Sequence, residues 1–227
     1  MDDKVFETAF DFIAPDARFF SLHGLGEPLL HPKFLEYLSR IVELRVGVII
    51  STNGILLYEG LANDIFNLLE KASPDTECFL SLHTQKSVEN WRMCLDVLKS
   101  HPNIRFYGNL LEHNETEAVM WLKECGIPDP LHHENIRCVT SHSFAGNVTN
   151  RKSVYNEIEI AHRIRNCVYI QDNKVNVAWD GRLKTCCFDS EITSGLGTIF
   201  DLDNTRTCEN GYSLCTNCDA DCTTNYR

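Results

Sequence analysis

Short apolar runs recur along roughly the first 145 residues, and segments with helical spacing separate them. The runs are Phe19–Leu22, Val46–Ile50, Cys78–Leu82, Ile104–Tyr107 and Ile136–Val139. They follow one another at intervals of roughly thirty residues, about the length of one strand-plus-helix unit. This alternation predicts an α/β domain built on a parallel sheet.

Three of the intervening segments carry apolar residues at helical spacing, which indicates helices packed on a core. The stripes are Phe34, Leu38, Ile41 and Arg45; Val88, Trp91, Leu95 and Leu98; and Ala118, Trp121, Leu122 and Cys125. Pro32 suits the first turn of the first helix. Asn114, with Glu117 three residues later, predicts a capping box for the third, and Gly126 suits the position after its end.

After Gly146 the pattern changes to short alternating runs joined by turn residues. Asp172-Asn173 and Asp180-Gly181 separate the runs 167–171, 174–179 and 182–187, which predicts a β-hairpin or meander. Beyond Gly197 the chain is polar and rich in turn residues, so it has little core of its own. A small terminal module of this kind needs a staple. We therefore expect two domains, residues 1–150 and 160–227.

Composition narrows the classes of partner. The chain has 227 residues, 43% of them hydrophobic, and a formal net charge of −11. This charge argues against nucleic acid as the main partner, because a phosphate backbone needs clustered lysine and arginine. No apolar run approaches the ~20 residues of a membrane span, and the acidic start has no signal-peptide core. We expect a cytoplasmic protein with reduced cysteines, with disulfides as the alternative.

Cysteines are concentrated at the end of the chain. Seven of the eleven occur from Cys167 onward, namely Cys167, Cys186, Cys187, Cys208, Cys215, Cys218 and Cys222. Thiolates bind soft metals and iron–sulfur clusters, four to a site. The pair Cys215-x-x-Cys218 can aim two sulfurs at one centre, and Cys167 and Cys186 are placed to supply the other two. Structural zinc is the alternative, although a zinc ribbon usually has two such pairs. The pattern leaves open whether Cys187, Cys208 or Cys222 replaces one of these ligands.

Polar and glycine residues follow the first three runs, where ligands bind in parallel α/β sheets. Gly24, Gly26 and Glu27 lie in the segment His23–Pro32, and the glycines would let backbone approach a ligand closely. Ser51-Thr52-Asn53-Gly54 ends the second run, and Ser81 with His83 ends the third. Taken singly, each segment is equally typical of a turn, a helix cap or a structural histidine.

Together, Gly24–Leu30, Ser51–Gly54 and Ser81–His83 resemble successive strand ends of the radical S-adenosylmethionine superfamily. The tail, with 179–187, 196–199 and Cys215-x-x-Cys218, resembles the SPASM/twitch auxiliary-cluster module that follows that barrel. The resemblance implies a partial (β/α)6-type barrel, followed by a small cysteine-rich β-hairpin module. It implies that Gly24, Gly26 and Glu27 hold the methionine ammonium, that Ser51 and Asn53 approach the nucleoside, and that Ser81 lies at the same cofactor site. It also implies an auxiliary [4Fe–4S] cluster on Cys167, Cys186, Cys215 and Cys218.

The chain departs from the family at its start. The family's Cys-x-x-x-Cys-x-x-Cys triplet, which holds the cluster that cleaves S-adenosylmethionine, does not occur in the sequence. We expect the barrel to lack its first strand, so that Phe19–Leu22 has an unpaired edge open to a protein partner.

The resulting prediction is a radical S-adenosylmethionine-like iron–sulfur protein, part of an enzyme that modifies a peptide or a small molecule. This chain alone is not expected to cleave S-adenosylmethionine. The alternatives are a non-catalytic binding or electron-transfer protein with only the auxiliary cluster, and a zinc-stapled domain.

Overall fold

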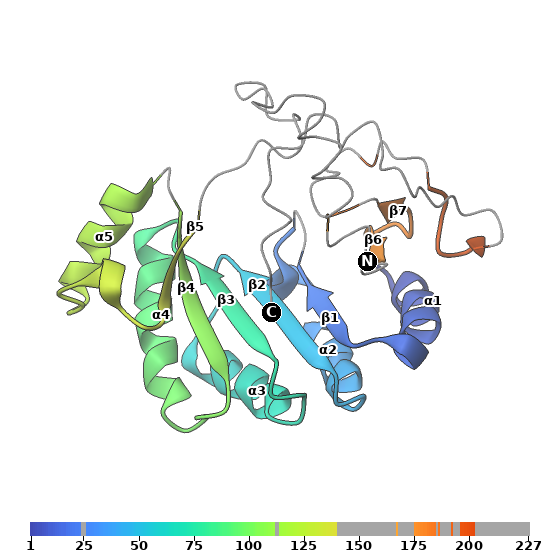
Figure 1. Cartoon of the computed structure of the whole chain (residues 1–227), viewed down its shortest axis with the longest axis horizontal. Coiled ribbons are helices and arrows are strands. Elements are labelled where there is room, and N and C mark those ends of the chain that lie inside the picture. Colours follow the sequence, from blue (N-terminus) through green and yellow to red (C-terminus); the bar gives the residue numbers. More distant parts are fainter. Residues whose placement is uncertain are drawn as a thin grey trace. The chain divides into compact units, whose positions relative to one another are not determined.

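The computed structural model describes residues 1–23, 26–111, 114–139, 167, 175–184, 186, 192 and 196–202. Figure 1 shows the helices and strands of the chain. The chain divides into two units. One is Asp16–Ser141, and the other combines Met1–Pro15 with His142–Arg227. The predicted domain boundaries, at residues 150 and 160, lie outside the described residues.

The Asp16–Ser141 unit is built on a five-stranded parallel sheet. Its strands are β1 (Phe19–Leu22), β2 (Gly47–Thr52), β3 (Glu77–Ser81), β4 (Arg105–Leu111) and β5 (Ile136–Val139), and they pair in that order. All five predicted runs are therefore strands, and the predicted parallel α/β fold is confirmed. In the described part of the chain, β1 pairs with β2 and has no second neighbour.

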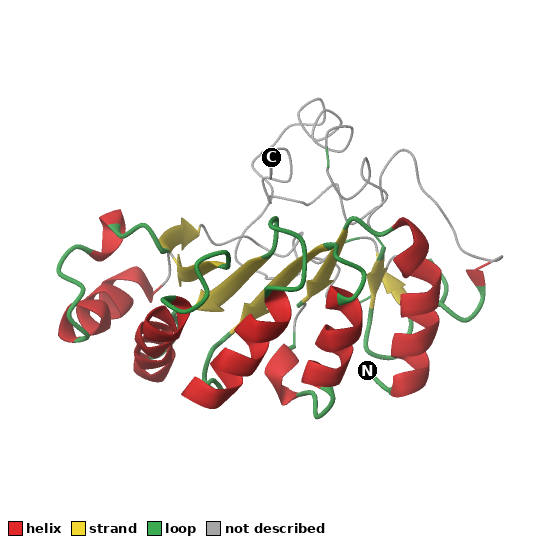
Figure 2. Ribbon diagram, turned by 90° about the horizontal axis from the view of Figure 1, so that it is seen from below, coloured by secondary structure: helices red, strands yellow, loops and turns green. Residues whose placement is uncertain are grey.

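Four helices connect successive strands and lie on one face of this sheet, as Figure 2 shows. They are α2 (Phe34–Val42), α3 (Glu59–Leu69), α4 (Gln85–Leu98) and α5 (Glu115–Glu124). Two short 3₁₀ turns, η2 (Pro28–Leu30) and η4 (Pro130–His132), precede α2 and β5. No helix in the described part of the chain is long and apolar enough to cross a membrane.

Three details of the predicted helices are wrong. Helix α2 begins at Phe34, so Pro32 precedes its first turn. It ends at Val42, because the Leu44 and Arg45 amides donate to carbonyls three residues earlier, which is a tighter turn than that of an α-helix. Arg45 itself has a φ of 55°, which is outside the helical region. Asn114 is the N-cap of α5 but makes no capping bond, because its side-chain amide donates instead to the Leu82 carbonyl at 2.9 Å.

The core lies between the sheet and these helices. Along β4, residues 106, 108 and 110 are buried while the residues between them are partly exposed. The largest side chains that are almost completely buried in this unit come from both layers: Trp91, Phe66, Phe106, Leu38, Ile41, Ile50, Leu69, Leu80, Leu82, Leu110 and Leu122. Since side chains alternate along a strand, the other set of strand residues lies on the face opposite the helices, which we call the open face.

Gly108 in β4 is required by the close approach of α4 to the sheet. A Cβ atom at this position would lie 2.8 Å from the indole nitrogen of Trp91 and 3.0 Å from a methyl carbon of Leu82. Trp91 is fully buried, so it has little room to move away. The absence of a side chain at residue 108 therefore lets the tryptophan pack directly on the strand.

The second unit contains a helix and a small hairpin. Helix α1 (Asp3–Ile13) is capped by Asp2, whose carboxylate accepts from the Val5 amide at 2.9 Å. Strands β6 (Asn176–Val177) and β7 (Leu183–Lys184) pair antiparallel, as the turn at Asp180-Gly181 predicts. A small core joins the helix to the hairpin and the following segment, and consists of Ala9, Leu183, Leu196 and Ile199. The predicted turn at Asp172-Asn173 lies outside the described residues.

Candidate functional site

Glu27 lies just beyond the carboxyl end of β1 and is held there by three hydrogen bonds. Its Oε1 accepts from the Leu29 amide at 3.0 Å, which caps η2, and from the Thr52 hydroxyl at 2.6 Å. Its Oε2 accepts from the Asn53 amide at 2.7 Å. The carboxylate therefore ties the loop after β1 to the end of β2, and its orientation is fixed.

The end of β2 turns sharply, and two side-chain hydrogen bonds hold this turn. The Asn53 side-chain oxygen accepts from the Ile55 amide at 2.9 Å. The buried Asn90 of α4 donates to the Gly54 carbonyl at 2.7 Å. Gly54 has a φ of +71°, and a Cβ there would lie 2.6 Å from Leu80. Only glycine fits this position without strain, so the turn that presents Asn53 depends on Gly54.

The other predicted cofactor residues lie along the same end of the sheet. Ser51 and Ser81 are half-buried, at alternating positions that place them on the open face. Space for a Cβ at Gly26 is open, with no atom within 4 Å. Gly24 lies outside the described residues. The structure thus brings Glu27 and Asn53 together through a direct hydrogen bond and places the two serines on strands β2 and β3 of the same face.

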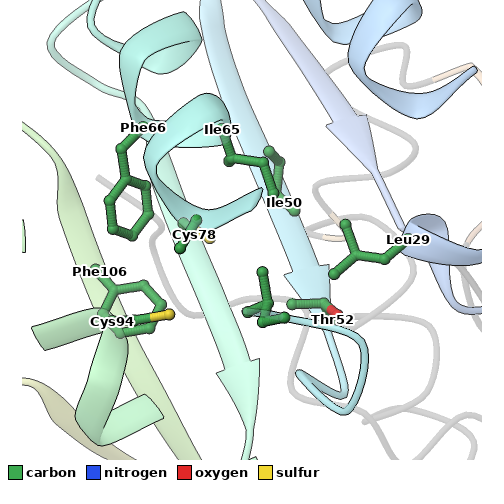
Figure 3. Close-up of a pocket in the computed structure, with 10 residues that line it drawn as sticks. Leu29, Ile50, Thr52, Ile65, Phe66, Cys78, Cys94 and Phe106 are labelled. Carbon is green, nitrogen blue, oxygen red and sulfur yellow. The ribbon is translucent and has the colours of Figure 1, made fainter. Parts of the chain in front are cut away.

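The helix-facing side of this region is closed to ligands. Figure 3 shows the small space there, between Leu29, Thr52 and Phe106. Its volume is about 10 Å³, at the lower limit for a single water molecule. A ligand at the strand ends must therefore approach from the open face or from the loops.

Two cysteines that line this closed space are core residues. Burial raises the pKa of Cys94 to about 12, and burial with the nearby Cys94 thiol raises the pKa of Cys78 as well. Both thiols thus remain neutral at ordinary pH. Because a metal or a cluster needs thiolates, these two cysteines do not suit a ligand role.

Two of the four predicted cluster ligands are described. Cys167 is half-buried and Cys186 is buried, with 8% of its surface exposed. Cys215 and Cys218 lie outside the described residues. Within the described part of the chain, no group of three or more metal-binding side chains gathers at one point. The four-cysteine ligand set accordingly stays a prediction.

Sequence reasoning missed a cluster of charged and aromatic side chains on the open face. Arg137 of β5 donates to Glu77 of β3 at 3.2 Å, and its guanidinium lies 3.5 Å from the ring centre of Tyr107 on β4. Phe79 stacks beside Tyr107, with ring centres 5.8 Å apart. Part of the signal was present in the sequence, since Glu77 and Phe79 occupy alternating positions of one strand and Arg105 and Tyr107 those of the next.

Comparison with solved structures gives one informative neighbour. The crystal structure of BtrN in complex with AdoMet and 2-DOIA matches with a TM-score of 0.58 and 16% sequence identity. The match covers 100% of this chain and 84% of that one. At this identity the likeness concerns the fold alone, so the chain has an α/β fold like that of BtrN. No family model matches the chain, and no curated protein matches it.

Proposed function

We propose that this chain binds S-adenosylmethionine at the carboxyl ends of its strands, as part of a radical enzyme that modifies a peptide or a small molecule. The observation that carries the proposal is the fixed carboxylate of Glu27. The fold of BtrN, a protein solved with AdoMet, supports it.

Glu27 retains the capacity to bind an ammonium group. A carboxylate has about four acceptor positions, and three are used by the Leu29 amide, the Thr52 hydroxyl and the Asn53 amide. Among the described residues, the position that is left without a partner is on Oε2. A methionine ammonium bound there would gain a charge-assisted hydrogen bond to an oxygen that needs no reorientation.

The neighbouring residues suit the rest of the cofactor. The Asn53 side-chain oxygen is used within its own turn, which leaves the amide group to donate to a ribose hydroxyl. Ser51 offers a hydroxyl on the open face of the same strand. A Cβ added to Gly26 would have no atom within 4 Å, so a ligand can approach the backbone of this residue closely.

The proposal includes an auxiliary [4Fe–4S] cluster on Cys167, Cys186, Cys215 and Cys218. Such a cluster, when bound, supplies electron transfer or an anchor for substrate. The protein would contribute four thiolates, two from Cys167 and Cys186 and two from the Cys215-x-x-Cys218 pair. Of these, Cys186 is buried and follows the β6–β7 hairpin. A cluster there would staple a segment that is poor in apolar residues.

Equilibrium dialysis with radiolabelled S-adenosylmethionine tests the cofactor site. The purified chain should bind the cofactor, and Ser51→Ala should weaken binding by about 0.5–1.5 kcal/mol, the value of one hydrogen bond. Ser100→Ala, at an exposed position just beyond the end of α4, is the matched control. Absence of binding by the unmodified chain would refute the proposal.

Anaerobic reconstitution with iron and sulfide tests the cluster. We expect broad visible absorption and stoichiometric iron and sulfide, both lost in Cys218→Ala and retained in Cys138→Ala, which removes an exposed cysteine of β5. The terminal segment should then become sensitive to protease in the first variant alone. A colourless protein with stoichiometric zinc would instead establish the zinc-stapled domain.

A second candidate is a binding or electron-transfer protein without radical chemistry. The absence of Cys-x-x-x-Cys-x-x-Cys from the sequence favours it. With iron, sulfide, reductant and S-adenosylmethionine, this chain alone is expected to release no 5′-deoxyadenosine. Its release would show that other ligands hold a cleaving cluster here and would exclude the second candidate.

A further inference from the structure

A row of polar residues crosses the open face near the carboxyl end of the sheet. Ser81 of β3, Asn109 of β4 and Arg137 of β5 are direct partners in the strand register. Adjacent strands are about 4.8 Å apart, so the three side chains stand side by side on one face. All three are half-buried.

Arg137 is held in a defined orientation. Its guanidinium stacks 3.5 Å from the ring centre of Tyr107, and one of its Nη atoms donates to Glu77 at 3.2 Å. A guanidinium has five N–H donors arranged as a fork, and Glu77 takes one of them. The stacking fixes the plane of the group, so its remaining donors are prepared for a planar, bidentate acceptor.

Neighbouring charges distinguish Arg137 from the other arginine on this face. Arg105 lies at the amino end of β4 and contacts Asp75 at 3.5 Å and Glu77 at 3.9 Å. It therefore shares Glu77 with Arg137 but has a second carboxylate of its own. Arg137 is level with Asn109 and is thus nearer the carboxyl ends of the strands than its supporting ring, Tyr107.

Asn109 provides the second observation. Its side-chain oxygen is buried and has no hydrogen-bond partner in the described structure. A buried acceptor without a donor is costly, so such an atom usually has a partner in the functional state. The missing partner is a donor, and it must lie beside Arg137 and Ser81.

We propose that this row binds a substrate carboxylate that is followed by an amide N–H, as in an acylated amino acid or the carboxyl end of a peptide. Arg137 takes the carboxylate, and the Asn109 oxygen accepts from the amide N–H. This proposal adds a substrate class to the proposed function. It rests on that function only for the reaction that follows binding, and not for the binding itself.

Saturation-transfer NMR on the purified chain tests this with three small probes. N-acetylglycine carries both groups, N-acetylglycinamide lacks the charge, and N-acetylsarcosine lacks the N–H. N-acetylglycine should bind, N-acetylglycinamide at least about tenfold more weakly, and N-acetylsarcosine several-fold more weakly, as expected for lost charged and neutral hydrogen bonds. Equal binding of all three probes, or of none, would overturn the proposal.

Variants identify the residue. Arg137→Gln should weaken the binding of N-acetylglycine at least about tenfold. Arg105→Gln removes the same charge from the same face and should leave the affinity for N-acetylglycine unchanged. Arg137→Lys keeps the charge but loses the paired N–H donors of the guanidinium, so it should give an intermediate loss of affinity for N-acetylglycine. This variant tests the assignment if Arg137→Gln does not fold. Unchanged affinity in both Arg137 variants would overturn the assignment.

S-adenosylmethionine also has a carboxylate, so its affinity is measured in the same variants. An unchanged cofactor affinity in Arg137→Gln supports a substrate site, and a matching loss would assign the row to the cofactor and overturn the proposal. If the chain binds N-acetylglycine but no S-adenosylmethionine, the proposed function fails while the carboxylate site stands.

Discussion

The replacement of Glu27 by Gln separates two roles of this residue, since the side chain both ties two loops together and is proposed to bind a ligand. In the structure, its two oxygens accept from the Leu29 amide, the Thr52 hydroxyl and the Asn53 amide. Glutamine has one acceptor oxygen and one donor group. In either orientation, the donor group must face at least one backbone N–H.

The expected loss of stability follows from these contacts. A hydrogen bond to a charged group contributes about 1.5–3 kcal/mol and a neutral one about 1 kcal/mol. Glu27→Gln loses about 2 kcal/mol for the bond to one backbone amide and about 1 kcal/mol as the remaining bonds become neutral. The sum is about 3 kcal/mol, which corresponds to a fall in Tm of about 6–12 °C for a chain of this size.

Thermal and urea unfolding, followed by tryptophan fluorescence, to which the buried Trp91 contributes, measure the change without any ligand. Glu59→Gln is the matched control, because it removes the same charge from an exposed position in the first turn of α3. That variant should lose less than about 1 kcal/mol, the interaction of a carboxylate with a helix start. Equal stability of the two variants would show that the three hydrogen bonds of Glu27 do not stabilise the fold, and would leave Glu27 with a ligand role only.

Three further predictions concern the packing behind the site. Gly108→Ala should lower the free energy of unfolding by about 1–3 kcal/mol in urea titrations, because its Cβ would press on Trp91, whereas Gly60→Ala in α3 should not destabilise. The pKa of Cys94 is raised by burial to about 12, so above its ordinary value of 9.0 the unfolded chain releases a proton that the folded chain retains. Stability should fall by about 1.4 kcal/mol per pH unit for this thiol, and Cys94→Val under reductant should show a correspondingly flatter decline. Asn90→Leu leaves the carbonyl of residue 54 without its donor, and hydrogen exchange should show faster opening of residues 53–57, with weaker S-adenosylmethionine binding; unchanged exchange would contradict this.

The order of amino acids was enough to predict the five strands, three of the four helices between them (α2, α4 and α5) and the hairpin turn at Asp180-Gly181. These elements depend on local periodicity and on residues with special backbone preferences, both of which are visible without a structure. The same order located Glu27 and Asn53 at strand ends, because turns after parallel strands are where polar residues interrupt apolar runs.

The contacts of those residues could be known only from the folded chain. Glu27 and Asn53 are far apart along the sequence, and their hydrogen bond exists because parallel pairing brings the ends of β1 and β2 together. The capping box predicted at Asn114 failed for the same reason, since a carbonyl from the end of β3 competes for the side chain. The row that ends in Arg137 likewise depends on the register of three strands, and residues from three distant segments meet only once the sheet has formed.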